Sequence, residues 1–589
     1  MSDTLDETER DGQADLGLRG FLTLAGGFAG AALWVIVKVF ADYWETNGHL
    51  VLTLAIFLAV WFSVLLVACG PLRILPGVLA ATIVAVPAAF LQLIVALRYA
   101  AIDDLLSLGL HEIALAGIVV IATPFVIAGL RRPGGWTDYP SLFIEAWTIV
   151  MRSTAAGVFT GIFWAVIVLS NLLLNLVGIG LIDWILDISA APLIISGALF
   201  GLSLAVIHEY AGSLAPHLVL RLFRLVLPPV LVVSVIFLVA VPFRGLSDLF
   251  GGGISSALVM MCMTIGALTL VTTAVDQDDG LAVAAPWMRL SARIMAMLTP
   301  LMAGLAVYAV WIRVADYGWT PERLAALTAA LILLLYGIAY AVAALRGAPW
   351  MALIRRSNVV LALVTLGIAV LWLTPVLNAE RISARSQLAR LEAGRVDIAD
   401  FDFWRVGRAW GHASEDALEA LKVMEGPDRA ALDRQLEVLA ASDNRYEYMY
   451  HPDPQQTVTL ADVLPKVVIL PEGADLPAWL SSDQGMMQQF ASSCRVLAGE
   501  GSTCVMIVGD FAALTGDEVL FVENGANDNV MFTEGQVRLL FGDRGRAAET
   551  FIGYIPVDQF RALRGGDYRV EPVEIQALKT GDKTYLLVP

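Results

Sequence analysis

Charged residues are scarce in this sequence. They make up 16% of the 589 residues, while hydrophobic residues make up 58%. About a quarter of the residues are charged in an ordinary soluble protein, so the chain is not expected to be soluble throughout. The formal net charge of −17 gives no general basic character of the kind that a nucleic-acid partner selects. We therefore exclude nucleic acid and expect the lipid bilayer as the main partner.

Residues that build metal and catalytic sites are also scarce, with six His and four Cys in the whole chain. "HEYAGSLAPH" (208–217) lacks the i, i+4 histidine of a metalloprotease, and no phosphate-binding Gly-rich loop with Lys is present. "DQDDG" (276–280) begins like a calcium loop but lacks the alternation and the distal Glu, so we expect a solvated loop. The sequence predicts no cofactor, metal or catalytic residue, and enzyme status stays uncertain, with a non-enzymatic role favoured.

Long apolar runs fill the first two thirds of the chain. A run of about 20 apolar residues can cross a bilayer as a helix. We predict eleven such spans, at roughly 21–40, 51–69, 77–97, 112–130, 155–178, 190–208, 225–243, 254–274, 294–312, 325–345 and 358–376. The fold class is therefore a polytopic α-helical membrane protein with a C-terminal α+β soluble domain. Its expected parts are a disordered cytoplasmic tail (1–20), the helical bundle (21–376), a helical junction of the outer domain (377–450) and the α+β domain (451–589).

The last part of the chain changes pattern after "HPDP". Short runs rich in β-branched and aromatic residues, such as "CVMIVGDF" (504–511) and "EVLFVE" (518–523), alternate with turn residues. Residues 484–497 are typical of a helix. We expect a mostly antiparallel sheet with helices.

Lys and Arg are distributed unevenly among the short loops. The N-terminal tail and the loops after even-numbered spans carry more of them than the loops after odd-numbered spans. Basic loops stay in the cytoplasm, so the N-terminus should be cytoplasmic. Eleven spans then place the C-terminal domain in the periplasm.

Several stretches resemble a known family, most specifically "YGWTPER" (317–323) and "NAERISARSQLARL" (378–391). They are similar to the bacterial integral-membrane proteins of the domain-of-unknown-function-4153 family, over roughly residues 140–430. The resemblance implies a multi-pass protein of the bacterial inner membrane. It implies no reaction, substrate or catalytic residue.

Two cysteines of the C-terminal domain, Cys494 and Cys504, are ten positions apart. The segment between them contains Gly499 and Gly501, which let a chain turn back. In an oxidising compartment such a pair forms a disulfide, which we predict here.

Polar groups within the spans are few. Asn171 and Asn175 share one helical face, where they serve helix packing or, alternatively, a polar substrate path. Pro300 is expected to kink the ninth span. Three Gly-xxx-Gly pairs, at 26/30, 157/161 and 197/201, favour close helix packing.

Four carboxylates fall in predicted outer loops: Asp42, Glu45, Asp183 and Asp187. Beside a membrane they could serve an enzyme that uses lipid-linked sugars, as metal ligand and general base. The alternative is that they are simply solvated.

Function remains open at this level. The favoured hypothesis is a non-enzymatic scaffold or sensor whose periplasmic domain binds envelope proteins. The first alternative is a permease for an apolar or lipid-like substrate, which needs few buried charges, and the lipid-linked sugar enzyme is a weaker one.

Overall fold

The computed structural model describes most of the chain in two compact units, Met1–Leu436 and Glu437–Pro589. The residues outside the description are 1, 42, 101, 210–215, 245–255, 348, 426–427, 443, 446–447, 449–462, 495, 498–500, 512–516, 525–533, 544–545, 571–576, 581–582 and 587–589. The division falls later than residue 377, so most of the segment expected as the outer domain's junction packs with the helical bundle instead.

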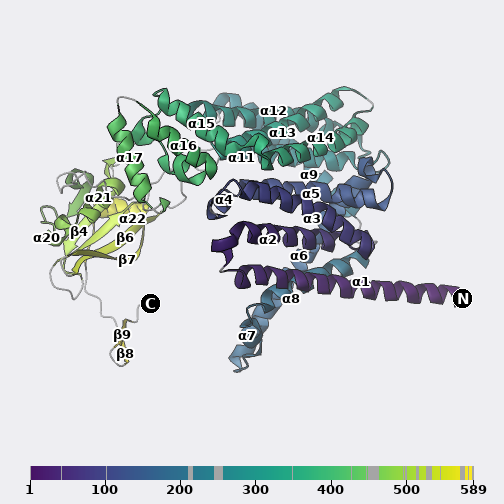
Figure 1. Cartoon of the computed structure of the whole chain (residues 1–589), viewed down its shortest axis with the longest axis horizontal. Coiled ribbons are helices and arrows are strands. Elements are labelled where there is room, and N and C mark those ends of the chain that lie inside the picture. The colour runs from purple at the N-terminus through teal and green to yellow at the C-terminus, as the bar shows by residue number, and fades with distance from the viewer. Residues whose placement is uncertain are drawn as a thin grey trace. The chain divides into compact units, whose positions relative to one another are not determined.

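The first unit is a bundle of long helices that run alongside one another (Figure 1). The helices of this unit, the short α4 and α7 included, are α1 (Ser2–Trp34), α2 (Tyr43–Ala68), α3 (Ile74–Ala96), α4 (Ile102–Leu108), α5 (Leu110–Arg131), α6 (Tyr139–Leu176), α7 (Leu181–Leu186), α8 (Ala191–Glu209), α9 (Pro216–Arg244), α11 (Ser256–Val275), α12 (Pro286–Tyr317), α13 (Pro321–Leu345), α14 (Trp350–Leu373), α15 (Ala379–Glu392) and α16 (His412–Val423). Helix α17 (Arg429–Ala441) crosses the division between the two units. Eleven helices of the described chain are long and apolar enough to cross a membrane, which confirms the predicted class. Helix α1 is assigned from Ser2, ahead of its apolar run, where a disordered tail was expected.

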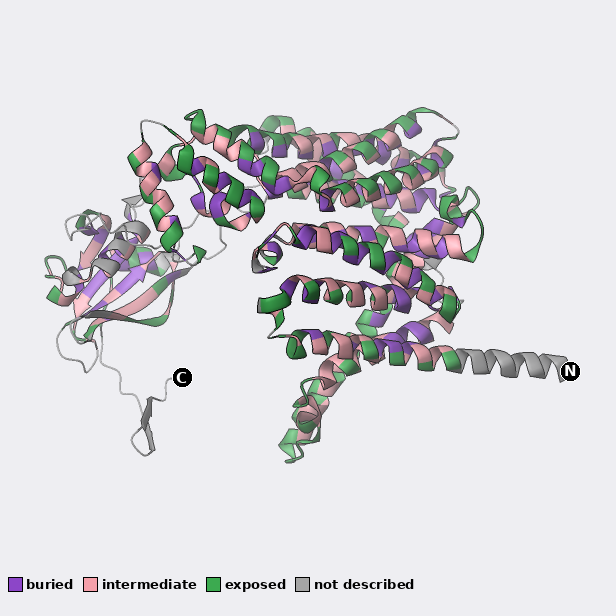
Figure 2. Cartoon of the chain, viewed as in Figure 1, coloured by how far each residue is buried: buried purple, intermediate pink, exposed green. Residues whose placement is uncertain are grey.

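Buried and exposed residues alternate along the helices of the bundle (Figure 2), and on some helices the buried ones are mostly small. Helix α3 turns Ala81, Ala85 and Ala88 inward, each 0% exposed, while Leu75 and Phe90 are 80% and 62% exposed. Small side chains let backbones approach closely, and large apolar ones can face lipid at no cost. The pattern is that of a membrane bundle.

Helices α1 and α8 meet through glycine. A Cβ atom built on Gly26 would lie 2.0 Å from the carbonyl oxygen of Gly197, and one built on Gly197 would lie 2.0 Å from that of Gly26. Only glycine permits this approach. The third pair differs, because a Cβ on Gly157 or Gly161 would meet no heavy atom of the described chain within 4 Å. The packing prediction for that pair was wrong.

Helix α6 is one continuous helix of 38 residues, Tyr139–Leu176, and so begins well before the span expected at 155–178. Helix α12 is likewise uninterrupted at Pro300. There α13 presents Gly337, where an added Cβ would lie 2.8 Å from the Pro300 nitrogen. The proline therefore forms part of a close helix contact, and its kink stays a prediction.

The second unit contains a five-stranded sheet in the order β1-β4-β5-β6-β7. The strands are β1 (Val467–Leu470), β4 (Cys504–Gly509), β5 (Glu518–Glu523), β6 (Glu534–Asp543) and β7 (Arg546–Pro556). Strands β1 and β4 are parallel and the other neighbours antiparallel, which matches the expected mostly antiparallel sheet. Two small ribbons add β2 (Val496–Leu497) with β3 (Gly501–Ser502) and β8 (Ala577–Thr580) with β9 (Lys583–Leu586).

Both faces of the sheet are covered by helices. Met506 packs in one core with Phe490 of α21 (Gln484–Ser493). Its neighbour Val505 packs in the other with Phe560 of α22 (Val557–Arg564). Successive residues of a strand point to opposite faces, so the continuous apolar run of β4 serves two cores.

The sulfur atoms of Cys494 and Cys504 lie 2.08 Å apart, at bonding distance. Cys494 follows the last turn of α21, and Cys504 begins β4. The disulfide joins helix to sheet within a buried core, as the spacing predicted. Cys69 and Cys262 are free.

Candidate functional site

Five residues separate the end of the last membrane helix from helix α15, which folds back onto the bundle. The Asn378 side chain caps it by accepting a hydrogen bond from the Arg381 amide. This fixed start directs Glu380 inward, where it is 2% exposed. A carboxylate so deeply buried needs partners.

Those partners form what we call the junction network: Arg98, Tyr99, His111 and Glu380. His111 Nε2 lies 3.0 Å from Glu380 Oε1, and the Tyr99 hydroxyl donates to the same oxygen at 3.2 Å. An Arg98 nitrogen lies 3.8 Å from Oε2. Tyr99 follows α3 and His111 opens α5, so the network joins three separate parts of the unit.

The network changes the ionisation of its members. Burial opposes the charge on Glu380, but the hydrogen bond from His111 and the charges of His111 and Arg98 outweigh it and lower the pKa of Glu380. Burial, reinforced by the Glu380 charge, raises the pKa of Tyr99. Burial also lowers the pKa of Arg98. The ionised carboxylate is therefore the stable form.

The junction network lies among buried polar atoms that are not hydrogen-bonded within the described chain. They include Nδ1 of His111, Oε2 of Glu380, the three guanidinium nitrogens of Arg98 and both carboxylate oxygens of Glu112. Buried polar atoms in proteins are usually satisfied by protein or by ordered water. The junction network therefore has several buried donors and acceptors that are available for further hydrogen bonds.

A second contact holds the other end of α15. The Gln387 amide donates to the carbonyls of Tyr317 and Trp319 at 3.1 and 2.8 Å, and Arg390 donates to that of Asp316. The loop between α12 and α13 bends at Gly318, where φ is +74° and a Cβ would lie 2.5 Å from Arg390 Cδ. Glycine thus opens the loop's carbonyls to α15.

Between this loop and the segment after α15 lies a polar pocket of about 590 Å³, which we call the junction pocket. Its lining residues include three aromatic ones, Tyr317, Phe401 and Trp410. They also include four arginines and four aspartates: Arg323, Arg390, Arg395, Arg405, Asp316, Asp397, Asp400 and Asp402. Its size suits a small molecule. The mixed charges suit a ligand that carries both signs.

The predicted polar residues at the far end of α6 meet in a different place. The Asn171 amide donates to Asp183 Oδ1 at 2.6 Å, and the Asn175 amide to Oδ2 at 2.9 Å. These hydrogen bonds lower the pKa of Asp183. A carboxylate held in this way is a weaker base, so the geometry does not favour a general base here.

The remaining outer-loop carboxylates do not join it. Asp187 ends α7 and makes a backbone hydrogen bond to Asp183. Asp42 lies outside the described residues, as does the side chain of Glu45. Among the described residues, no three His, Cys, Asp or Glu side chains are grouped to hold a metal ion.

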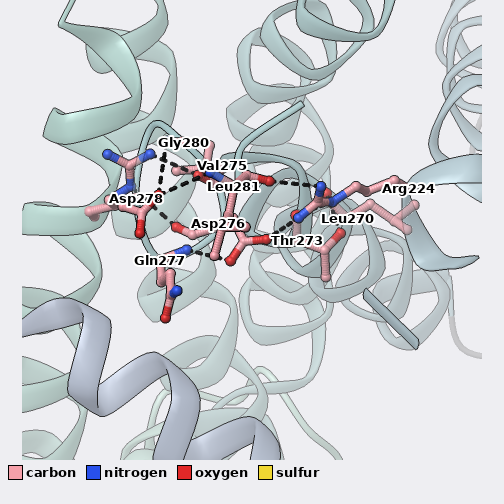
Figure 3. Close-up of polar contacts among 10 residues, drawn as sticks. Arg224, Leu270, Thr273, Val275, Asp276, Gln277, Asp278, Gly280 and Leu281 are labelled. Carbon is pink, nitrogen blue, oxygen red and sulfur yellow. Dashed lines mark hydrogen bonds and ion pairs between the residues drawn. The ribbon is translucent and has the colours of Figure 1, made fainter. Parts of the chain in front are cut away.

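The "DQDDG" loop was expected to be solvated, and for Asp276 that was wrong. Asp276 is 1% exposed and pairs with Arg224 of α9 (Figure 3). Arg224 also donates to the carbonyls of Thr273 and Leu281, both at 2.9 Å. Arg355 of α14 donates to the carbonyl of Val275 at 2.8 Å. The two arginines thus donate hydrogen bonds to backbone carbonyls at the end of α11 and hold the loop in place.

The C-terminal unit carries an exposed apolar edge. Strand β7 is an outer strand of the sheet, and its Phe551, Ile552 and Tyr554 are 51%, 57% and 61% exposed. Ile552 is an extra residue in the pairing with β6, opposite the Val537–Arg538 step. Such a bulge shifts the alternation of side chains. Phe551 and Tyr554 consequently lie together, with ring centroids 5.0 Å apart.

Sequence reasoning missed the junction network. The motif at 378–391 supported only the family resemblance; within it, Arg381 lies 3.8 Å from Asp416 on the surface. In the sequence, Glu380 follows an apolar helix and lies two residues after the Asn378 cap. That position does not indicate that its side chain is buried.

Comparison with known proteins adds no assignment. No family model, no curated protein and no solved structure matches the chain.

Proposed function

We propose that this protein is a non-enzymatic sensor or scaffold of the bacterial inner membrane, with its N-terminus in the cytoplasm and its C-terminal unit in the periplasm. The distribution of Lys and Arg among the loops supports this orientation. Membership of the domain-of-unknown-function-4153 family is part of the same proposal, and it rests on the two sequence motifs.

The observation that carries the proposal is the edge strand β7. A long outer strand with exposed Phe551, Ile552 and Tyr554 is a liability unless something pairs with it or covers it. Sheet edges commonly bind an extended segment of another protein, whose side chains then fill apolar positions. An envelope protein with such a segment is the partner we expect.

The junction pocket supports the sensing half of the proposal. It is built from α15 and the residues that follow, which lead along the chain toward the C-terminal unit. A ligand that carries both signs would bridge the arginines and aspartates of the pocket. Binding would stabilise α15 against the loop at Gly318.

The interaction role is tested with the full chain in its native membrane. A photo-crosslinking residue at Thr550 should capture a partner in cells, and the Phe551→Ser, Tyr554→Ser double variant should lose that product. Val570→Ser is the matched control, since Val570 is 57% exposed in the same unit. An unchanged product in the double variant would contradict the proposal.

Orientation has its own experiment. Alkaline phosphatase fused to the C-terminus should be active, and a fluorescent protein that matures only in the cytoplasm should be dark. The opposite pair of results would reverse the topology while leaving the fold unaffected.

One observation favours the permease alternative: an apolar cavity lies inside the bundle, at the end away from α15. The lipid-linked sugar enzyme gains no comparable support, since Asp183 is held by two amides.

A further inference from the structure

The apolar cavity has a volume of about 450 Å³ and lies among α5, α6, α11, α13 and α14. Aromatic rings from three helices line it, including those of Phe125, Phe143, Trp147 and Tyr336, and no charged residue is among its lining residues. Its volume falls within the range of about 300–1,000 Å³ that is typical of small-molecule sites. An ionic ligand would be left unpaired here, so the occupant must be neutral where it touches the walls.

One wall of the cavity is polar. Thr272 and Tyr340 hydroxyls lie 2.6 Å apart, Tyr340 donates to Asn358 Oδ1 at 2.7 Å, and the Asn358 amide donates to the Tyr139 hydroxyl at 3.4 Å. In this chain of bonds the Tyr139 oxygen accepts, while its hydrogen has no acceptor among the described residues. The cavity therefore offers one free donor, which fits a ligand with a single carbonyl acceptor.

The polar wall lies near one face of the membrane. Asn358 is one helical turn from Arg355, and Thr272 is one turn before Asp276, whose charges mark the end of the bundle. Tyr139 directly follows Asp138, the cap of α6. From that level the cavity extends along α5 toward the middle of the span, with Pro124 and Val120 among its lining residues.

The cavity also opens sideways. Two lining residues, Val120 and Ile265, are 68% and 51% exposed on membrane-spanning helices. Apolar side chains exposed at that depth face the hydrocarbon layer. A ligand can therefore enter the cavity sideways from the bilayer.

We propose that this cavity binds one acyl chain of a glycerophospholipid, from the leaflet at the Arg355 end of the bundle, with the ester carbonyl accepting the hydrogen bond of Tyr139. The depth of the polar wall fits that carbonyl, which lies at the border between headgroup and hydrocarbon. The aromatic walls then enclose the first part of the chain. This site is independent of the proposed scaffold role, and it would supply the binding step if the protein also moves lipid.

The test uses the full chain in nanodiscs that contain a phospholipid with a photoactivatable diazirine on its acyl chain. After illumination, mass spectrometry should place adducts on cavity peptides such as those with Leu333 and Ala362. Ala146→Phe, which fills the cavity, should reduce these adducts about tenfold, because a benzyl group occupies the space of the chain. Ala155→Phe is the control on the same helix, since Ala155 is exposed, and it should label like the unchanged chain.

Tyr139→Phe removes only the donor. It should lower labelling about two- to tenfold, the worth of one net hydrogen bond. A melting curve of each variant in detergent shows that it is folded, and Ala146→Leu replaces Ala146→Phe if the larger side chain prevents folding.

Three results would overturn the proposal. Adducts could spread evenly over the outer faces of the bundle, or Ala146→Phe could label as strongly as Ala155→Phe. The third result would be displacement of the label by a short-chain quinone but not by excess unlabelled phospholipid. That result would assign the cavity to a different neutral lipid.

Discussion

Replacing Glu380 with Gln tests the junction network directly. The change keeps the shape of the side chain but removes the charge that faces Arg98 and His111. Breaking a buried ion pair by removing one partner costs about 3–5 kcal/mol. The Arg98 contact here is long, at 3.8 Å, and its side chain is 10% exposed. We therefore expect a smaller loss, about 2–3 kcal/mol.

The loss should appear locally, in the docking of α15. Hydrogen exchange of the peptide that covers 379–392 measures that docking in the intact, detergent-solubilised chain. Protection should fall by roughly 30- to 150-fold, because each 1.4 kcal/mol is worth about a factor of ten. Glu392→Gln is the control, since Glu392 ends the same helix and is exposed.

Acid should produce the same change in the unmodified chain. The pKa of Glu380 is lower when α15 is docked than when it is free. Its contribution is thus fully present above the free value, about 4.3, and is lost as pH falls through the docked value. In Glu380→Gln this acid step should disappear. Equal exchange in Glu380→Gln and Glu392→Gln, at neutral and low pH alike, would refute the reasoning.

Other substitutions test other contacts. Gly197→Ala should destabilise the bundle by about 2 kcal/mol or more in a detergent melt, because its Cβ would strike the α1 backbone, whereas Gly157→Ala should be tolerated. Arg224→Ala should cost about 3 kcal/mol in the same melt by leaving the buried Asp276 carboxylate without this partner; a change under ~0.5 kcal/mol would contradict a structural role. Cys494 and Cys504 should resist maleimide until reduced, and reduction should cost about 2–3 kcal/mol; reaction of both before reduction would argue against the disulfide.

A further pair of substitutions concerns the hairpin between α6 and α8. Asn171→Leu with Asn175→Leu removes both donors to Asp183. If the amides serve packing, the melting temperature should fall. Unchanged melting with a lost cellular function would point to a substrate path.

Sequence patterns predicted helices, strands and the disulfide well where a single short segment determines the structure. The eleven spans follow from apolar runs, and the strand at Cys504 follows from its β-branched residues. The Cys494–Cys504 pair needed only a short turn between a helix and a strand. In each case the physical cause lies within about 25 residues of chain.

Burial of charge could not be predicted in this way. Glu380, His111 and Asp276 all sit at helix ends, where a charged residue normally meets water. Each is buried because a distant segment folds over it: α15 over the ends of α3 and α5, and Arg224 and Arg355 over the loop after α11. The glycine pairs teach the same lesson. The pair at 157/161 has the same spacing as that at 197/201, but among the described residues only the latter meets another helix within 4 Å of an added Cβ.

The glycine contact between α1 and α8 also sets an order of assembly. Gly26 is made about 170 residues before Gly197, so at ~5–20 residues per second α1 waits roughly 10–30 s for its partner. During that time the smooth glycine face of α1 is open to lipid or to other proteins. Helix α1 is thus made well before α8, the sixth of the eleven candidate spans, which it packs against. An insertion factor that shelters small-residue faces would act on this chain at that stage.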